Sequence, residues 1–214
     1  MNLRLSVLAA LLAGGPAAAE PESPAGPLQP LGITVSGGVS LGAWEAGALY
    51  LFTEAEKLAP RHRVRVVTGA SAGSMNALNV ALSSCRAPNP YPQRDLGWRG
   101  WVPVGFDQLF DQKRASADAL FVRDALLSGF EQLRQQWNEG VDEGCDVVFA
   151  ATVTRAKPRQ VLLREGLTVP RALETFVVRI EGRGRGKPPR LSNYVNPSSP
   201  LPAPLLPFRD DEGD

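Results

Sequence analysis

The feature that most constrains the fold of this chain is a sharp, glycine-flanked turn around Ser71. Residues 69–73 read GASAG, a G-x-S-x-G pattern that directly follows the strand-like run VRVVT at residues 64–68. Residues 74–82 then predict a helix, so the segment reads as strand, turn and helix. Glycines on both sides of the serine remove side chains that would clash in so tight a turn. The segment therefore predicts a serine hydroxyl held at the carboxyl edge of a sheet, as in a nucleophile elbow.

A second glycine-rich turn lies upstream, where residues 36–42 read SGGVSLG. It follows a short apolar strand at residues 31–35 and precedes a predicted helix at residues 43–58. Small consecutive residues let backbone N–H groups converge at a helix start, which makes an anion site. The turn lacks both the G-x-G-x-x-G spacing of a dinucleotide fingerprint and the Gly-Lys-Ser/Thr of a P-loop. Phosphate binding by a nucleotide-binding α/β protein is therefore the weaker interpretation.

An oxyanion hole is the stronger interpretation of this glycine-rich turn, because an oxyanion hole needs only backbone donors beside a nucleophile. Two consecutive parallel strands would bring both turns to the same carboxyl edge of the sheet. We therefore expect the N–H groups of Gly37, Gly38 and Val39 to face an oxyanion formed at Ser71. The single histidine, His62, precedes the serine, whereas the histidine of an α/β-hydrolase triad follows it. A triad of that order is excluded, and we expect His62 to be a solvated loop histidine rather than a catalytic one.

The two turns resemble the oxyanion loop and the nucleophile elbow of the patatin-like phospholipase family. The resemblance is carried by SGGVSLGAWEAG at residues 36–47 and GASAGS at residues 69–74, with one helix and one strand between them. It is strong over residues 31–82 and weaker from there to about residue 182. It implies an α/β fold, a three-layer α/β/α domain with a mostly parallel central sheet. It also implies a cofactor-free Ser-Asp dyad that hydrolyses acyl esters of lipids.

The aspartate of that dyad is not identifiable from the family pattern. The family takes it from an Asp-Gly-Gly or Asp-Gly-Ala turn after the elbow, and this chain contains no Asp-Gly dipeptide. Asp146 is a candidate base only by default, and the acidic residues at 209–214 read as a frayed terminus. Val39 and Leu41 also depart from the family's glycine and arginine, although both keep their backbone donors. We expect a truncated acyl hydrolase, with an inactive lipid- or protein-binding relic of the fold as the alternative.

The amino terminus reads as a secretory signal peptide. Arg4 precedes a short apolar stretch, and an Ala-x-Ala site ends at Ala19. We expect export to a periplasmic or extracellular location, and no other segment reaches transmembrane length. We expect a signal peptide at residues 1–19, a linker at residues 20–30, a partial acyl hydrolase domain at residues 31–182 and an irregular Pro/Gly-rich tail at residues 183–214.

Export also bears on the two cysteines. Two cysteines commonly pair in an oxidising compartment, so Cys85 and Cys145 are candidates for a disulfide. Two separate buried thiols are the alternative. No Cys/His cluster indicates a metal site. A formal net charge of +1 argues against a nucleic-acid partner, so the expected partner is a lipid or acyl ester. A transient membrane-surface contact is the minority interpretation of the basic residues 179–190.

The rest of the chain predicts mixed elements. Residues 86–104 read as an irregular excursion whose Trp98 and Trp101 pack on the domain, with a lipid-contacting lid as the alternative. An apolar stripe predicts a helix over residues 116–138, ended by Gly140. Further strands are expected in the sequence that follows, at residues 147–154, 160–164 and 176–180, with a turn near Pro158.

Overall fold

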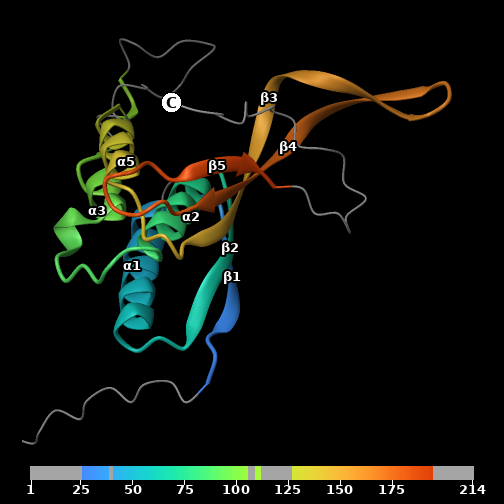
Figure 1. Cartoon of the computed structure of the whole chain (residues 1–214). Coiled ribbons are helices and arrows are strands. Elements are labelled where there is room, and N and C mark those ends of the chain that lie inside the picture. Colours follow the sequence, from blue (N-terminus) through green and yellow to red (C-terminus); the bar gives the residue numbers. More distant parts are fainter. Residues whose placement is uncertain (1–25, 39–40, 106–108, 112–126, 195–214) are drawn as a thin grey trace, which may run out of the picture.

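The chain folds around one mixed β-sheet (Figure 1). The computed structural model describes residues 26–38, 41–105, 109–111 and 127–194. Its sheet has the order β1-β2-β3-β4-β5. β1 pairs with β2 and β2 with β3 in parallel, whereas β4 and β5 are antiparallel to their neighbours. The strands are β1 Gln29–Val35, β2 His62–Ala70, β3 Asp146–Arg164, β4 Leu167–Glu181 and β5 Arg190–Asn193. The α/β class and a sheet that is parallel in its core are confirmed.

The helices lie together on one side of this sheet (Figure 1). Strand order advances in one direction from β1 to β3, and right-handed crossovers then place both connecting helices on the same face. Within the described ranges there are thus two layers, and the third layer expected from the family resemblance is not among them. No helix in these ranges has the length and apolar character to cross a bilayer. The helices are α1 Gly42–Leu58, α2 Ala72–Ser83, the short η1 Pro92–Arg94, α3 Leu96–Trp101 and α5 Leu127–Glu139.

The core lies between α2 and the inner face of the sheet. Small side chains on α2 let the helix approach the strands closely, and they are fully buried there. The strands contribute mainly valine and isoleucine, whose branched side chains suit a packed sheet face. The buried residues of this cluster include Val67, Ala77, Val80, Ala81, Leu82, Val147, Val178 and Ile180.

The hairpin after Cys145 differs from the prediction. The expected turn near Pro158 is wrong: β3 continues to Arg164, and the chain reverses at Glu165 and Gly166. Gly166 has φ +76°, a conformation that glycine adopts without steric cost. The proline falls where the pairing of β3 with β4 is interrupted, between Thr154 and Arg159. An irregularity in the ladder tolerates proline because no backbone N–H is needed there.

The boundaries of two other elements, β5 and α5, differ from the prediction. β5 lies inside residues 183–214, for which we expected little regular structure, and it pairs with the edge of β4. Free N–H and C=O groups on that edge order a segment of weak intrinsic preference. α5 occupies the second half of the predicted helix and ends before Gly140, which has φ +77°. Its predicted first half lies mostly in residues 112–126, outside the described residues.

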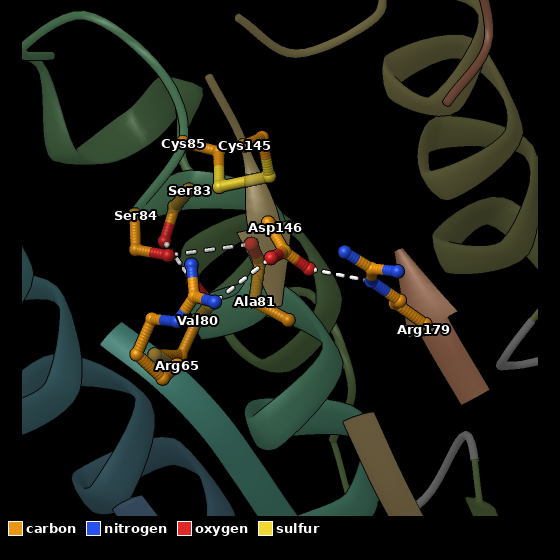
Figure 2. Close-up of a disulfide and its surroundings, with 9 residues drawn as sticks. All are labelled: Arg65, Val80, Ala81, Ser83, Ser84, Cys85, Cys145, Asp146 and Arg179. Atoms are coloured by element: carbon orange, nitrogen blue, oxygen red, sulfur yellow. Dashed lines mark hydrogen bonds and ion pairs between the residues drawn. A yellow bond between two sulfur atoms is a disulfide. The ribbon is translucent and has the colours of Figure 1, made fainter. Parts of the chain in front are cut away.

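A disulfide joins the end of α2 to the start of β3 (Figure 2). Cys85 and Cys145 have Cα atoms 5.3 Å apart, within the range that a disulfide can span. Of the two alternatives left open by the sequence, pairing is therefore confirmed. The bond closes a loop of 60 residues that contains α3 and α5.

Candidate active site

Ser71 occupies the strained turn between β2 and α2. It has φ 51° and ψ −125°, and it is the one non-glycine residue with positive φ in the described part of the chain. Such a conformation costs on the order of 1–3 kcal/mol and persists only where the surroundings impose it. Ser71 is exposed, and its side chain makes no capping hydrogen bond to α2. The hydroxyl is therefore held at a helix start without being used to stabilise that helix.

Steric contacts of the two flanking glycines impose this turn. A Cβ atom on Gly69 would lie 2.3 Å from the carbonyl oxygen of Gly73. A Cβ atom on Gly73 would lie 2.1 Å from the carbonyl oxygen of Ser36, at the end of β1. Both contacts are to backbone atoms, which cannot move aside as a flexible side chain could. The G-x-S-x-G pattern is thus required by the packing of the turn against itself and against β1.

The glycine-rich loop after β1 runs beside Ser71. A Cβ atom on Gly37 would lie 3.1 Å from the carbonyl oxygen of Ala70 and 3.3 Å from Cβ of Ser71. Gly38 follows with φ +146°, in a conformation that L side chains rarely adopt. The two turns that the sequence predicted to meet are therefore neighbours at the carboxyl edge of β1 and β2. Val39, the third expected oxyanion donor, lies outside the described residues.

A comparison with protein families agrees with this arrangement. The family model described as patatin-like phospholipase matches residues 33–140, which include both turns. No curated protein and no solved structure matches the chain. The chain belongs to the patatin-like phospholipase family. The match supports a lipid acyl hydrolase-like family for this patatin-like chain, and it spans the turns around Gly37 and Ser71.

Glu45 and Asn76 fix the loop and the elbow to each other, a role that the sequence analysis missed. Oε1 of Glu45 accepts a hydrogen bond of 2.8 Å from Oγ of Ser36. Nδ2 of Asn76 donates to the carbonyl oxygen of Gly42 at 2.9 Å and lies 3.4 Å from Oε2 of Glu45. Asn76 is only 2% exposed, and a buried amide needs such partners. The sequence signal was a pair of asparagines, Asn76 and Asn79, among the small and apolar residues of α2.

Trp101 of α3 completes this network from outside. Its Nε1 donates a hydrogen bond of 2.7 Å to Oδ1 of Asn76. Its ring covers Gly42, since a Cβ atom there would lie 2.4 Å from the ring. Packing on the domain, the interpretation that we favoured over a lid, is confirmed for Trp101. Trp98, on the same short helix, remains 45% exposed.

An apolar pocket of about 230 Å³ opens between α2, α3 and α5. It begins one helical turn after Ser71, and its walls are almost entirely apolar. Oγ of Ser74 is buried at this end of α2 and has no hydrogen-bond partner among the described residues. The lining residues include Ser74, Met75, Leu78, Trp101, Phe130 and Leu133.

Asp146 lies at the opposite end of the sheet from Ser71, so its default candidacy as the base is wrong. β2 and β3 run in parallel with Ala70 opposite Thr152, which places Asp146, the first residue of β3, at the amino edge. Its carboxylate accepts hydrogen bonds of 2.8 Å from both Arg65 and Arg179. The hydrogen bond from Arg179, assisted by the charge of Arg65, lowers the pKa of Asp146 and keeps it ionised.

His62 also lies at the amino edge, as the first residue of β2. Its Nδ1 is 2.9 Å from Oε1 of Glu56, and its side chain is 39% exposed. Burial raises the pKa of Glu56, but the hydrogen bonds from His62 and from the backbone of Arg61 and His62 outweigh it and lower the pKa. The expected solvated loop position is wrong, because β2 begins at His62 and the side chain is partly buried beside Glu56. The described residues contain no group of His, Cys, Asp and Glu side chains that could hold a metal ion.

Proposed function

We propose that this chain hydrolyses acyl esters of lipids with Ser71 as the nucleophile. The observation that carries the proposal is a serine held at φ 51° beside Gly37, with an exposed hydroxyl that makes no capping hydrogen bond in the described part of the chain. Strain at a residue is retained where the surroundings impose it, and functional sites are where it clusters. Membership of the patatin-like phospholipase family supports the class of substrate.

In this mechanism Oγ of Ser71 attacks the ester carbonyl carbon, and the carbonyl oxygen becomes an oxyanion. The N–H groups of Gly37, Gly38 and Val39 donate to that oxyanion, each contributing on the order of 3 kcal/mol. The start of α2 adds a favourable dipole. Collapse of the intermediate expels the alcohol, which takes up a proton, and water then releases the acid from Ser71.

The base that removes the proton of Ser71 is the member of the proposed Ser-Asp dyad that is not yet assigned. In the described ranges no carboxylate forms a hydrogen bond with Oγ of Ser71. We propose that the dyad aspartate of the family comes from residues other than the described ones, and that the 214-residue chain alone turns over slowly. The alternative is a relic of the fold that binds lipid or protein and has no turnover at all.

Three proteins assayed side by side with p-nitrophenyl butyrate test this proposal. They are the 214-residue chain, the same chain extended by an Asp-Gly-Gly or Asp-Gly-Ala segment, and the extended chain carrying Ser71→Ala. We expect slow, fast and no turnover, because removing one member of such a unit costs orders of magnitude. Ser84→Ala, at the far end of α2, is the control and should leave turnover unchanged.

Fast, Ser71-dependent turnover by the 214-residue chain would instead locate a base within it. Lack of turnover by the extended chain, with its fold intact by circular dichroism, would favour the non-catalytic relic.

The apolar pocket beside α2 supports a further part of the proposal, that it holds the acyl chain of the substrate. Its volume of about 230 Å³ suits a short chain, and its walls offer few polar groups. Gly100 lines this pocket, and a Cβ atom there would meet nothing within 4 Å. Gly100→Val should therefore fold and narrow the pocket, lowering turnover of octanoate esters more than that of acetate esters. An equal loss of turnover on both esters would show that the acyl chain does not bind in this pocket.

We also propose that the chain is exported and that its signal peptide is cleaved after Ala19. The disulfide between Cys85 and Cys145 supports an oxidising compartment. Mass spectrometry of protein recovered from the periplasm or medium should give a mature terminus near Glu20. Recovery of the whole protein in the cytoplasm with Met1 intact would contradict export.

A further inference from the structure

The hairpin of β3 and β4 extends well beyond the sheet as a two-stranded ribbon (Figure 1). β2 accompanies β3 only as far as Thr152, and β5 accompanies β4 only from Val178 onward. We call residues 153–173 the β3–β4 arm. In the described structure, the strands of this arm have no other strand beside them. At about 3.3 Å per residue, the arm reaches on the order of 30 Å past the sheet.

The arm is strongly basic, although the protein as a whole is nearly neutral. It has a single carboxylate, Glu165, against five cationic side chains, and the whole chain has a formal net charge of +1. No aromatic residue accompanies the cations, unlike a surface on which nucleic-acid bases stack. The cationic residues are Arg155, Lys157, Arg159, Arg164 and Arg171.

Glu174, directly after the arm, holds two of these cations in place. Arg159 and Arg171 lie opposite each other across the ladder, where like charges repel. The carboxylate of Glu174 is 1% exposed and lies 3.4 Å from Nε of Arg159 and 3.7 Å from Nε of Arg171. The buried acid thus offsets the repulsion between this pair, while Arg155, Lys157 and Arg164 remain exposed.

The tip of the arm exposes leucines around its turn. Leu162 is 66% exposed, Leu163 is 64% exposed and Leu167 is 40% exposed. Single exposed leucines are normal on a protein surface, but three within six residues concentrate exposed apolar area at the projecting tip. An apolar tip on a basic arm has the chemistry of a membrane-surface contact, with an apolar part for the acyl boundary and charges for the phosphates.

We propose that the β3–β4 arm binds the surface of a bilayer that contains anionic phospholipids. The leucines of the tip enter the boundary between headgroups and acyl chains, and the arginines and lysine contact headgroup phosphates. The arm leaves the sheet beyond Thr152, which pairs with Ala70, so it departs from the edge that carries Ser71. As a route to substrate, this contact rests on the proposed lipid ester hydrolysis, but the binding itself does not need Ser71. A second copy of the chain fits the arm less well, because two arms with excess positive charge repel each other.

Co-sedimentation of the full chain with vesicles tests the proposal. Phosphatidylcholine vesicles are compared with vesicles that also contain phosphatidylglycerol, and we expect about tenfold tighter binding to the latter at low salt. Added salt should weaken that preference, since it screens exposed charges. Two variants should each lose most of the binding: Leu162→Ser with Leu163→Ser, and Arg155→Gln with Lys157→Gln and Arg164→Gln.

The matched control is Leu51→Ser with Leu58→Ser. These leucines are 68% and 66% exposed, as much as those of the tip, but they belong to α1. The control should bind anionic vesicles as the unmodified chain does. Equal binding to both vesicle types, or an equal loss in the control, would overturn the proposal.

Ser71→Ala separates this inference from the proposed function, because it should bind vesicles normally while having no turnover. A chain that binds vesicles through the tip but never hydrolyses an ester would leave the inference standing and remove the proposed function. If the leucine substitutions abolish a dimer seen by analytical ultracentrifugation and vesicle binding is absent throughout, the arm is a self-association surface and the proposal is wrong.

Discussion

The two edges of the sheet are built by different means. At the carboxyl edge, Ser71 is held in a strained conformation by close backbone contacts of Gly69, Gly73 and Gly37. At the amino edge, the chain is fastened by the Cys85–Cys145 disulfide and by a carboxylate between two arginines. Among the described residues, the hydroxyl at the carboxyl edge makes no capping hydrogen bond and stays exposed, whereas the carboxylates of Glu56 and Asp146 at the amino edge have partners within the protein.

α2 connects these two edges and explains why they differ. Its first turn packs on the end of β1 through Gly73, and its last turn leads directly into Cys85. Strain at one end of a helix persists only if the rest of the helix is over-determined by its surroundings. The buried face of α2 and the disulfide after it provide that constraint. The fastening at the amino edge therefore helps to hold the strained turn at the carboxyl edge.

The largest effect is expected from Gly73→Ala at the carboxyl edge. The added methyl group would meet the carbonyl oxygen of Ser36 at 2.1 Å, and neither backbone can give way without moving the elbow. We expect the free energy of unfolding, measured by urea denaturation, to fall by about 4 kcal/mol or to be lost entirely. The control is Gly47→Ala in α1, where a Cβ atom meets nothing within 4 Å. It should stabilise by up to about 1 kcal/mol, and equal behaviour of the two variants would disprove the steric basis of the elbow.

The next effect is expected from removing the disulfide at the amino edge. Cys85→Ala with Cys145→Ala should lower the free energy of unfolding by about 2–4 kcal/mol, because the bond closes a 60-residue loop in the unfolded chain. A reductant should destabilise the unmodified chain by the same amount and leave the double variant unaffected. Unfolding curves that do not respond to reductant in either protein would show that the bond contributes nothing.

A smaller effect of opposite sign is expected at the strained serine. Ser71→Gly should be about 1 kcal/mol more stable than Ser71→Ala, because glycine adopts φ 51° without the penalty that alanine shares with serine. Both variants should lack ester turnover in the extended chain. Thermal and urea unfolding of the two variants provide the measurement. If alanine were as stable as glycine at this position, no strain would be stored in the elbow.

The smallest effect is expected from Asp146→Asn. The hydrogen bond from Arg179 lowers the pKa of Asp146 in the folded state, so its contribution is complete above the pKa of an unfolded aspartate, about 4. It is lost as the pH falls through the lower pKa of the folded state. The partner arginines are more than 40% exposed, so we expect a loss of no more than about 1 kcal/mol at pH 7.

This difference between Asp146→Asn and the unmodified chain should shrink as the pH falls below about 4, because the protonated aspartic acid then resembles asparagine. Glu131→Gln, in an ion pair whose two side chains are 68% and 74% exposed, is the control and should change stability very little. A constant difference between pH 3 and pH 7 would assign the effect of the substitution to packing and not to charge.

The sequence by itself determined the local geometry of the site. Ser71 and its flanking glycines specify the turn because the steric requirements act within a few residues of the serine. The proximity of Gly37 also followed from the sequence, since consecutive parallel strands end at one edge. The stop at Gly140 is of the same kind, because the positive φ that ends a helix is a property of one residue.

Only the tertiary structure decided where distant residues meet. Asp146 looked like a default base until strand register placed it at the amino edge, beside Arg179, which is 33 residues away in the sequence. The partners of Asn76 come from two other helices, and β3 continues past Pro158 because β4 pairs with it on both sides of the irregularity. Hydrophobic period and turn chemistry reflect neighbours along the chain, whereas register and buried hydrogen bonds depend on which segments pack together.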